Sequence, residues 1–83
     1  MTSSIAAAGE FIATEIAWNG SASEKWISDK LASAGHEVDA ADVIAFAVAT
    51  GLLRKIPRLS GYTVTKRVNA RTFGRKFADW MAS

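Results

Sequence analysis

The 83-residue sequence contains no cysteine, only one proline and one histidine, and no long hydrophobic run. Without cysteine the chain forms no disulfide, and a single histidine leaves no ligand set typical of a zinc site. No stretch approaches the roughly 18 apolar residues that a transmembrane helix requires, and the first residues lack the basic segment of a signal peptide. We therefore expect a cytoplasmic protein that binds no metal or cofactor and does not enter a membrane.

Hydrophobic residues make up 49% of the chain and charged residues 22%, a balance typical of a globular domain rather than a disordered segment. The length predicts one domain over residues 1–83 and excludes a two-domain enzyme. Sixteen alanines favour helix. No glycine-rich phosphate loop or catalytic grouping is evident, and His36 is expected as an exposed polar residue of a turn. The protein is not expected to be an enzyme.

The net charge of +2 is unevenly distributed along the chain. Residues 1–53 carry seven acidic and two basic side chains, a net charge of −5, whereas residues 54–83 carry eight basic and one acidic side chain, a net charge of +7. The basic half indicates contact with nucleic acid. The alternative is that it balances the acidic half, either within one molecule or between copies of a homodimer.

Two helices are predicted in the first third of the chain. Ser3 or Ser4 caps a first helix that runs to about Trp18, with apolar residues at helical spacing. Ser21 and Glu24 have the spacing of a capping box, which predicts a second helix beginning one or two residues after Ser21.

The middle of the chain has the signals of a tight turn between two helices. Gly35 stands where a left-handed residue ends the second helix, and Val38 is expected to point inward from the turn. Asp39 caps a third helix that runs through about Thr50, and Gly51 ends it.

The pattern changes after Gly51. Residues 52–56 and 62–65 are predicted as two short strands, joined at residues 57–61 by a turn with a basic tip. Asn69 caps a last helix over residues 70–81. Its apolar face comprises Phe73, Phe77 and Trp80.

The stretch from Lys30 to Asp39, followed by Val43 to Leu53 and by Gly61-Tyr62-Thr63-Val64, resembles winged helix-turn-helix domains. In that family a short turn leads to a capped recognition helix, and an apolar Gly-Leu-Leu element leads into the hairpin wing. The resemblance covers about residues 22–67 and implies a mainly α fold with a small β-hairpin: three helices, a wing and a C-terminal helix. The alternative is a plain helical bundle in which residues 52–66 form an irregular loop.

A helix-turn-helix protein places the start of its recognition helix in the major groove of DNA. Here Asp39 and Asp42 would face phosphates, and the neighbouring alanines offer no hydrogen bond to a base, so this mode of reading is doubtful. Basic residues in the hairpin and the last helix suit phosphate contacts instead, with Tyr62 as a stacking or groove contact. The predicted nucleic-acid-binding residues are Arg54, Lys55, Arg58, Tyr62, Lys66, Arg67, Arg71, Arg75 and Lys76.

The sequence therefore favours a small DNA-binding protein, regulatory or accessory, that contacts double-stranded DNA through a basic wing and the C-terminal helix. Winged helices also serve as protein-interaction modules. The alternative is such a module, or a phage-encoded inhibitor similar in size and composition to anti-CRISPR proteins, which binds a protein partner through the face of Asp39 and Asp42. Trp18, Trp26 and Trp80 are expected in the core, the alternative being an exposed aromatic patch for a partner.

Overall fold

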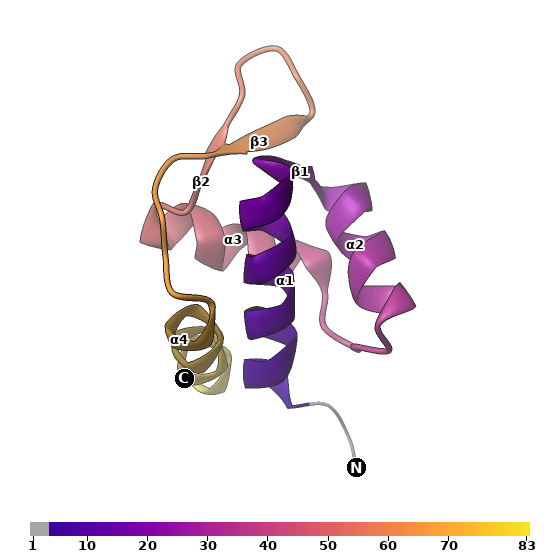
Figure 1. Cartoon of the computed structure of the whole chain (residues 1–83), viewed down its shortest axis with the longest axis vertical. Coiled ribbons are helices and arrows are strands. Elements are labelled where there is room, and N and C mark those ends of the chain that lie inside the picture. Colours follow the sequence, from indigo (N-terminus) through magenta and orange to yellow (C-terminus); the bar gives the residue numbers. More distant parts are fainter. Residues whose placement is uncertain (1–3) are drawn as a thin grey trace.

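The computed structural model describes residues 4–83, which form four helices and a three-stranded antiparallel sheet. The elements are α1 (Ile5–Asn19), β1 (Ser21–Ser23), α2 (Glu24–Ser33), α3 (Ala40–Thr50), β2 (Leu53–Lys55), β3 (Gly61–Val64) and α4 (Ala70–Ala82). The strand order is β1-β3-β2, and the β2–β3 hairpin projects beyond the helices at one end of the molecule (Figure 1). The predicted mainly α fold is confirmed, and the plain bundle with an irregular loop is wrong.

The starts of α1 and α2 are fixed by serine caps. Ser4 caps α1 by accepting a hydrogen bond from a backbone N–H of the first turn at 3.0 Å, and Ser3 lies outside the described residues. Ser23 caps α2 in the same way at 3.1 Å. The prediction that Ser21 caps this helix is wrong, because Ser21 lies in β1 and pairs with Thr63.

The other helix boundaries follow the local signals. Gly35 and Gly51 both adopt left-handed conformations, with φ of 77° and 84°; Gly51 directly follows α3, and Gly35 lies two residues after the end of α2. A side chain with a Cβ is strained in this region, which explains glycine at both positions. Asp39 and Asn69 cap α3 and α4, each accepting a backbone hydrogen bond at 3.0 Å. These ends were predicted correctly.

The small sheet has one face toward the core. Tyr62 in the central strand pairs with Ala22 on one side and Lys55 on the other, while Arg54 pairs with Thr63. Because side chains alternate along a strand, Ala22, Lys55 and Tyr62 share the inner face and Arg54 lies on the outer face. The register therefore places the side chains of Arg54 and Lys55 on opposite faces of the sheet.

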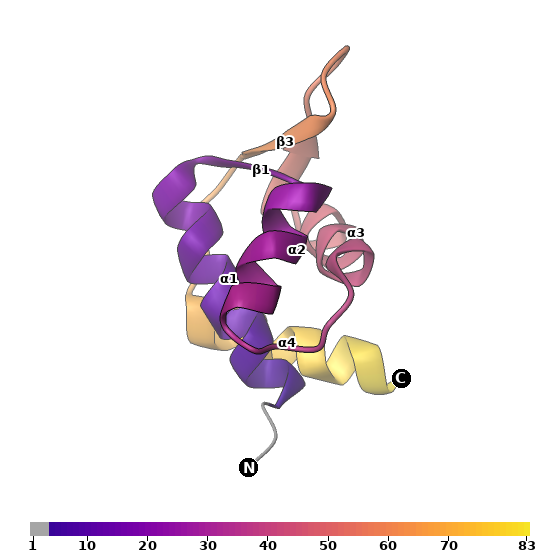
Figure 2. The same ribbon diagram turned by 90° about the vertical axis from the view of Figure 1, so that its right-hand side faces the viewer.

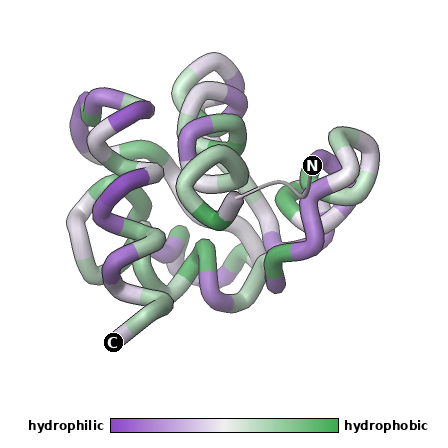
Figure 3. The backbone as a smooth tube through the Cα atoms, turned by 90° about the horizontal axis from the view of Figure 1, so that it is seen from below, coloured by the Kyte–Doolittle hydropathy of each residue, from purple (hydrophilic) through white to green (hydrophobic). Residues whose placement is uncertain are grey.

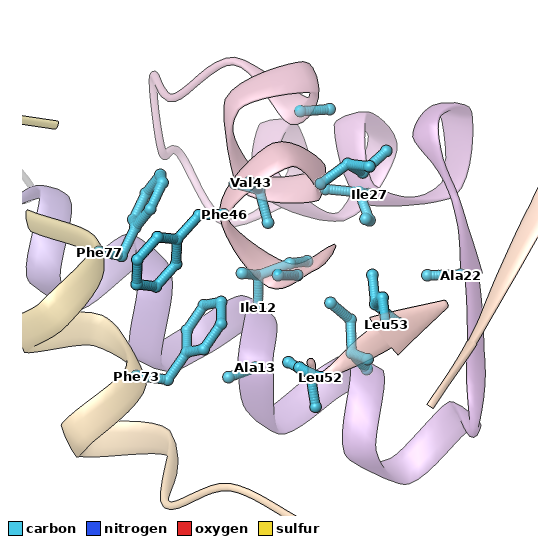
Figure 4. Packing of buried hydrophobic residues seen from close by; sticks show 14 of the residues in the cluster. Ile12, Ala13, Ala22, Ile27, Val43, Phe46, Leu52, Leu53, Phe73 and Phe77 are labelled. Atoms are coloured by element: carbon cyan, nitrogen blue, oxygen red, sulfur yellow. The ribbon is translucent and has the colours of Figure 1, made fainter. Parts of the chain in front are cut away.

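Phe46 connects α3 to α4 through an aromatic cluster. Figure 4 shows its ring between those of Phe73 and Phe77, at centroid distances of 5.2 and 5.5 Å. The ring of Trp80 lies 5.5 Å away on the open side of the cluster. Figure 3 shows hydrophobic residues in all four helices, and each helix contributes buried residues to the hydrophobic core.

α1 and α4 cross steeply with their backbones in contact (Figure 2). A Cβ placed on Gly9 would lie 2.8 Å from the Cα of Gly74. A Cβ placed on Gly74 would lie 2.7 Å from the backbone nitrogen of Glu10 and would also collide with the carbonyl oxygen of Ala6. Glycine at both positions thus permits an approach that no other residue allows.

The tryptophans do not all join the core. Trp26 is half-buried and packs against it, but Trp18 is 85% exposed and Trp80 is 39% exposed. The core prediction is therefore wrong for Trp18 and Trp80. Trp18 lies about 200° around the helix axis from the buried Ile16, which turns its ring toward solvent.

Candidate nucleic-acid interface

The segments that carry the basic residues of the second half follow one edge of the molecule, from the hairpin through residues 65–69 to α4 (Figure 1). All eight of these residues are exposed. They do not form a single cluster, because the hairpin and α4 are separated along the molecule, whose extents are 40 × 23 × 23 Å. We call this set the basic edge: Arg54, Lys55, Arg58, Lys66, Arg67, Arg71, Arg75 and Lys76.

The ion pairs among residues 4–83 lie elsewhere. Lys25 bonds Asp29 at 2.8 Å and Lys30 lies 3.4 Å from Glu15, both on the helical half of the molecule. The hydrogen bond to Asp29, with its negative charge, raises the pKa of Lys25. No residue of the basic edge has a carboxylate within 4.0 Å in the part of the chain that the structure describes. Ion pairing with the acidic half does not neutralise the edge.

In the hairpin, the three cations have different surroundings. The Lys55 ammonium donates to the carbonyl oxygen of Leu59 and lies 5.7 Å from the centre of the Tyr62 ring. It therefore closes the hairpin and covers Tyr62, which is itself half-buried. Arg54 on the outer face and Arg58 in the exposed loop, where φ is 67°, make no such contact with any residue that the structure describes.

The segment 65–69 is attached to the end of α3. The backbone N–H of Thr65 donates to the carbonyl oxygen of Leu52 at 2.9 Å, and its hydroxyl donates to that of Gly51. The ammonium of Lys66 lies beside Gly51, 3.5 Å from the position of a Cβ built there. A cation at the C-terminus of a helix is stabilised by the helix dipole. Lys66 therefore has a structural contact as well as an exposed charge.

Two hollows of about 450 Å³ flank this segment, and Lys66 lines both. One brings Lys66 together with Lys76 of α4, beside polar side chains of Thr50, Asn69 and Thr72. The other joins Lys66 and Arg67 to Trp18 at the end of α1, over the aliphatic side chains of Ala17, Leu52, Val64 and Val68. Lys66 thus lies between two hollows that the sequence did not place side by side.

α3 stands where the resembled family has its recognition helix, and its surface is poorly suited to reading bases. Asp39 is occupied as the cap of α3, where its carboxylate accepts a hydrogen bond from the backbone N–H of Ala41. Asp42 is half-buried in the first turn. The exposed surface of α3 consists of Ala41, Ala45, Val48 and Ala49. It offers no hydrogen-bonding side chain to a base edge.

The most informative residue that sequence reasoning placed wrongly is Trp18. In the sequence, one signal distinguishes Trp18 from a core residue: it lies two positions after Ile16, away from the face of α1 that carries the buried residues. His36 also differs from expectation. Its ring is half-buried and packs on Phe11 at a centroid distance of 5.3 Å, so it is not an exposed turn residue.

Comparison of the chain with models of protein families, with curated proteins and with solved structures gives no match. Within residues 4–83, no three acidic or histidine side chains are grouped as metal ligands. None of the helices in the same range is both long and apolar enough to span a bilayer. The inference of function rests on the basic edge and its surroundings.

Proposed function

We propose that the protein is a winged helix-turn-helix domain that binds double-stranded DNA, in a regulatory or accessory role, through phosphate contacts of the basic edge. The fold-level part of this proposal is supported by the order of elements from α2 to β3. The connection of residues 34–39, which contains Gly35 and Val38, joins α2 to a capped α3, and Gly51 leads directly into the hairpin.

The observation that carries the proposal is a row of exposed cations with no carboxylate partner among the described residues. Lysine and arginine side chains in this state bind phosphates and release the counterions condensed on DNA. Lys55 is excluded from the count because it closes the hairpin. Phosphate contacts carry no sequence information directly, and α3 offers no base-reading side chain, so we expect binding with little base specificity.

The length of the molecule fits a contact of about one turn of duplex. Its long axis is 40 Å, and one helical turn of B-DNA is about 34–36 Å. Cations of the hairpin at one end and of α4 at the other can thus contact phosphates about one turn apart. Contact with about five phosphates predicts a slope near −4.5 for the logarithm of the affinity against the logarithm of the salt concentration.

Fluorescence anisotropy with a labelled duplex at several salt concentrations tests this proposal. The double variant Arg58→Ala with Arg75→Ala removes one cation from each end of the edge, and both side chains are exposed. Loss of two phosphate contacts should make the salt slope shallower by about 1.8 and weaken binding to all duplex sequences alike.

The matched control is Lys25→Ala with Lys30→Ala, which removes the same charge from residues paired with Asp29 and Glu15. This control should keep the salt slope of the original protein. Absence of duplex binding at about 50 mM salt, or an equal effect of both double variants, refutes phosphate binding by the basic edge.

A second candidate function is recognition of a protein partner by α3. The exposed face of this helix is apolar, with Val48 45% exposed and only the carboxylates of Asp39 and Asp42 nearby in its first turn. Such a face suits a protein-interaction module or inhibitor better than a DNA reader. Val48→Lys with Asp42→Lys tests it, because Asp39 must be kept as the cap. Loss of a stoichiometric partner with unchanged duplex binding supports this function, and retention of that partner refutes it.

A further inference from the structure

Trp18 is the most exposed large hydrophobic side chain among the described residues, at 85% exposure. It stands at the end of α1, next to the turn into β1, where no further helical turn covers its ring. An indole in this position adds little to the core, and its apolar area remains in contact with water. Removal of that area from water by a ligand is favourable, so the surroundings of Trp18 indicate which ligand fits.

One side of Trp18 is the hollow that it shares with Lys66 and Arg67. The hollow measures about 450 Å³, within the range of small-ligand sites, and its floor is aliphatic. An aromatic wall, an apolar floor and two cations form a surface for a flat ring that carries negative charge. The nucleobase of a nucleotide and its phosphate have this combination of properties.

The other side of Trp18 has a different electrostatic character. There the ring borders Trp26, Asn19 and the ion pair of Glu15 with Lys30, whose charges lie 3.4 Å apart. The ammonium of Lys30 is thus already partnered, and the carboxylate of Glu15 disfavours a phosphate. The phosphate of a bound nucleotide is therefore directed toward Lys66 and Arg67.

We infer that Trp18 stacks on an unpaired base of a nucleic-acid strand whose flanking phosphates contact Lys66 and Arg67. This inference rests on the proposed phosphate binding by the basic edge. The base must be unpaired, because neighbouring pairs cover its face within a duplex. Lys66 also lines the hollow that contains Lys76, so a strand leaving Trp18 meets further cations toward α4. This continuation favours a strand over a free nucleotide.

The test is the affinity for a labelled oligothymidine of about 12 nucleotides, measured by anisotropy beside that for the duplex. Trp18→Ala should weaken oligothymidine binding about tenfold, whereas Trp18→Phe should retain most of it, because a phenyl ring also stacks. Val48→Ala, which removes exposed apolar area from α3, is the control and should leave the affinity unchanged. The high exposure of Trp18 means that its variants fold, which far-UV circular dichroism verifies.

A direct readout is the indole N–H resonance of Trp18, assigned by its absence from the spectrum of Trp18→Phe. It should shift on addition of oligothymidine, and only weakly on addition of thymidine monophosphate. Equal binding of the monophosphate and the oligonucleotide overturns the assignment of a strand.

Equal oligothymidine affinities of the original protein and Trp18→Ala overturn stacking, whether or not the duplex binds. If the duplex binds but Trp18→Ala leaves the oligothymidine affinity unchanged, the proposed function is supported and only the stacking by Trp18 is refuted. Tryptophan-dependent oligothymidine binding without duplex binding has the opposite meaning: it supports stacking and refutes the proposed duplex function.

Discussion

The glycine contact between α1 and α4 makes Gly74→Ala a sharp test of how tightly the two helices pack. In an exposed helix interior this substitution stabilises a protein by about 1 kcal/mol, because alanine has the higher helix propensity. At Gly74 the new methyl group would lie 2.7 Å from the nitrogen of Glu10 and would collide with the carbonyl oxygen of Ala6. Both obstacles are backbone atoms of α1, so they cannot rotate away as a side chain does.

The size of the effect follows from the separation that the methyl group requires. Ordinary contact begins at 3.4 Å, so the helices must move apart by roughly 1 Å at the crossing. A gap of that size removes about a quarter to a half of the dispersion attraction between the surfaces that face each other. Overpacking typically destabilises by ~1–3 kcal/mol, and rigid backbone places this case at or above the upper end. After the gain in propensity, we expect a net loss of about 2 kcal/mol.

Thermal and urea unfolding followed by circular dichroism measure this loss. For a domain of this size, about 2 kcal/mol lowers the midpoint temperature by roughly 8–16 °C. Ala45→Gly, at an exposed position in the middle of α3, is the control for propensity and should destabilise by about 1 kcal/mol. A stability increase for Gly74→Ala that mirrors the Ala45→Gly loss would show that propensity alone acts and that the helices are not in backbone contact.

Three further predictions concern the core, a cap and the interface. Phe46→Ala should destabilise by about 3–5 kcal/mol in urea unfolding, because its ring fills the space between three aromatic neighbours, and a loss below 1 kcal/mol contradicts this packing. Ser23→Ala should destabilise the protein by about 1 kcal/mol because it removes the cap of α2, whereas Ser21→Ala should change the stability very little. A larger loss for Ser21→Ala in thermal unfolding contradicts the assignment of Ser23 as the cap. For a molecule 40 Å long, duplex affinity should rise with duplex length up to about 12 base pairs and then level off, except for a statistical gain. A plateau at about half that length contradicts contact along the whole basic edge.

The helix boundaries were predictable because their signals are local. Asp39 and Asn69 satisfy backbone donors two or three residues ahead, and Gly35 and Gly51 adopt a conformation that their own lack of a Cβ permits. The strand β1 was not predictable in this way. It has three residues and exists through pairing with β3, about 40 residues later in the chain, where no local pattern records it.

The candidate interface was predictable in its charge and not in its arrangement. The excess of cations after residue 53 is visible in the sequence, and all of them are exposed. The hydrogen bond of the exposed Lys55 to the carbonyl oxygen of Leu59, and its place beside the Tyr62 ring, depend on its register opposite Tyr62. The meeting of Trp18 with Lys66 and Arg67 depends on how the segment 65–69 passes the end of α1. Both are consequences of tertiary structure.

The crossing of Gly9 and Gly74 also has a consequence for folding during synthesis. The two glycines are 65 residues apart in the chain, so their contact closes a long loop and forms only after the residues between them have been made. Until residues 70–82 emerge from the ribosome, the surface of α1 around Gly9 lacks the helix that packs against it in the folded protein. Nascent chains therefore expose an apolar helix surface of the kind that chaperones bind, and completion of α4 is the step that removes it.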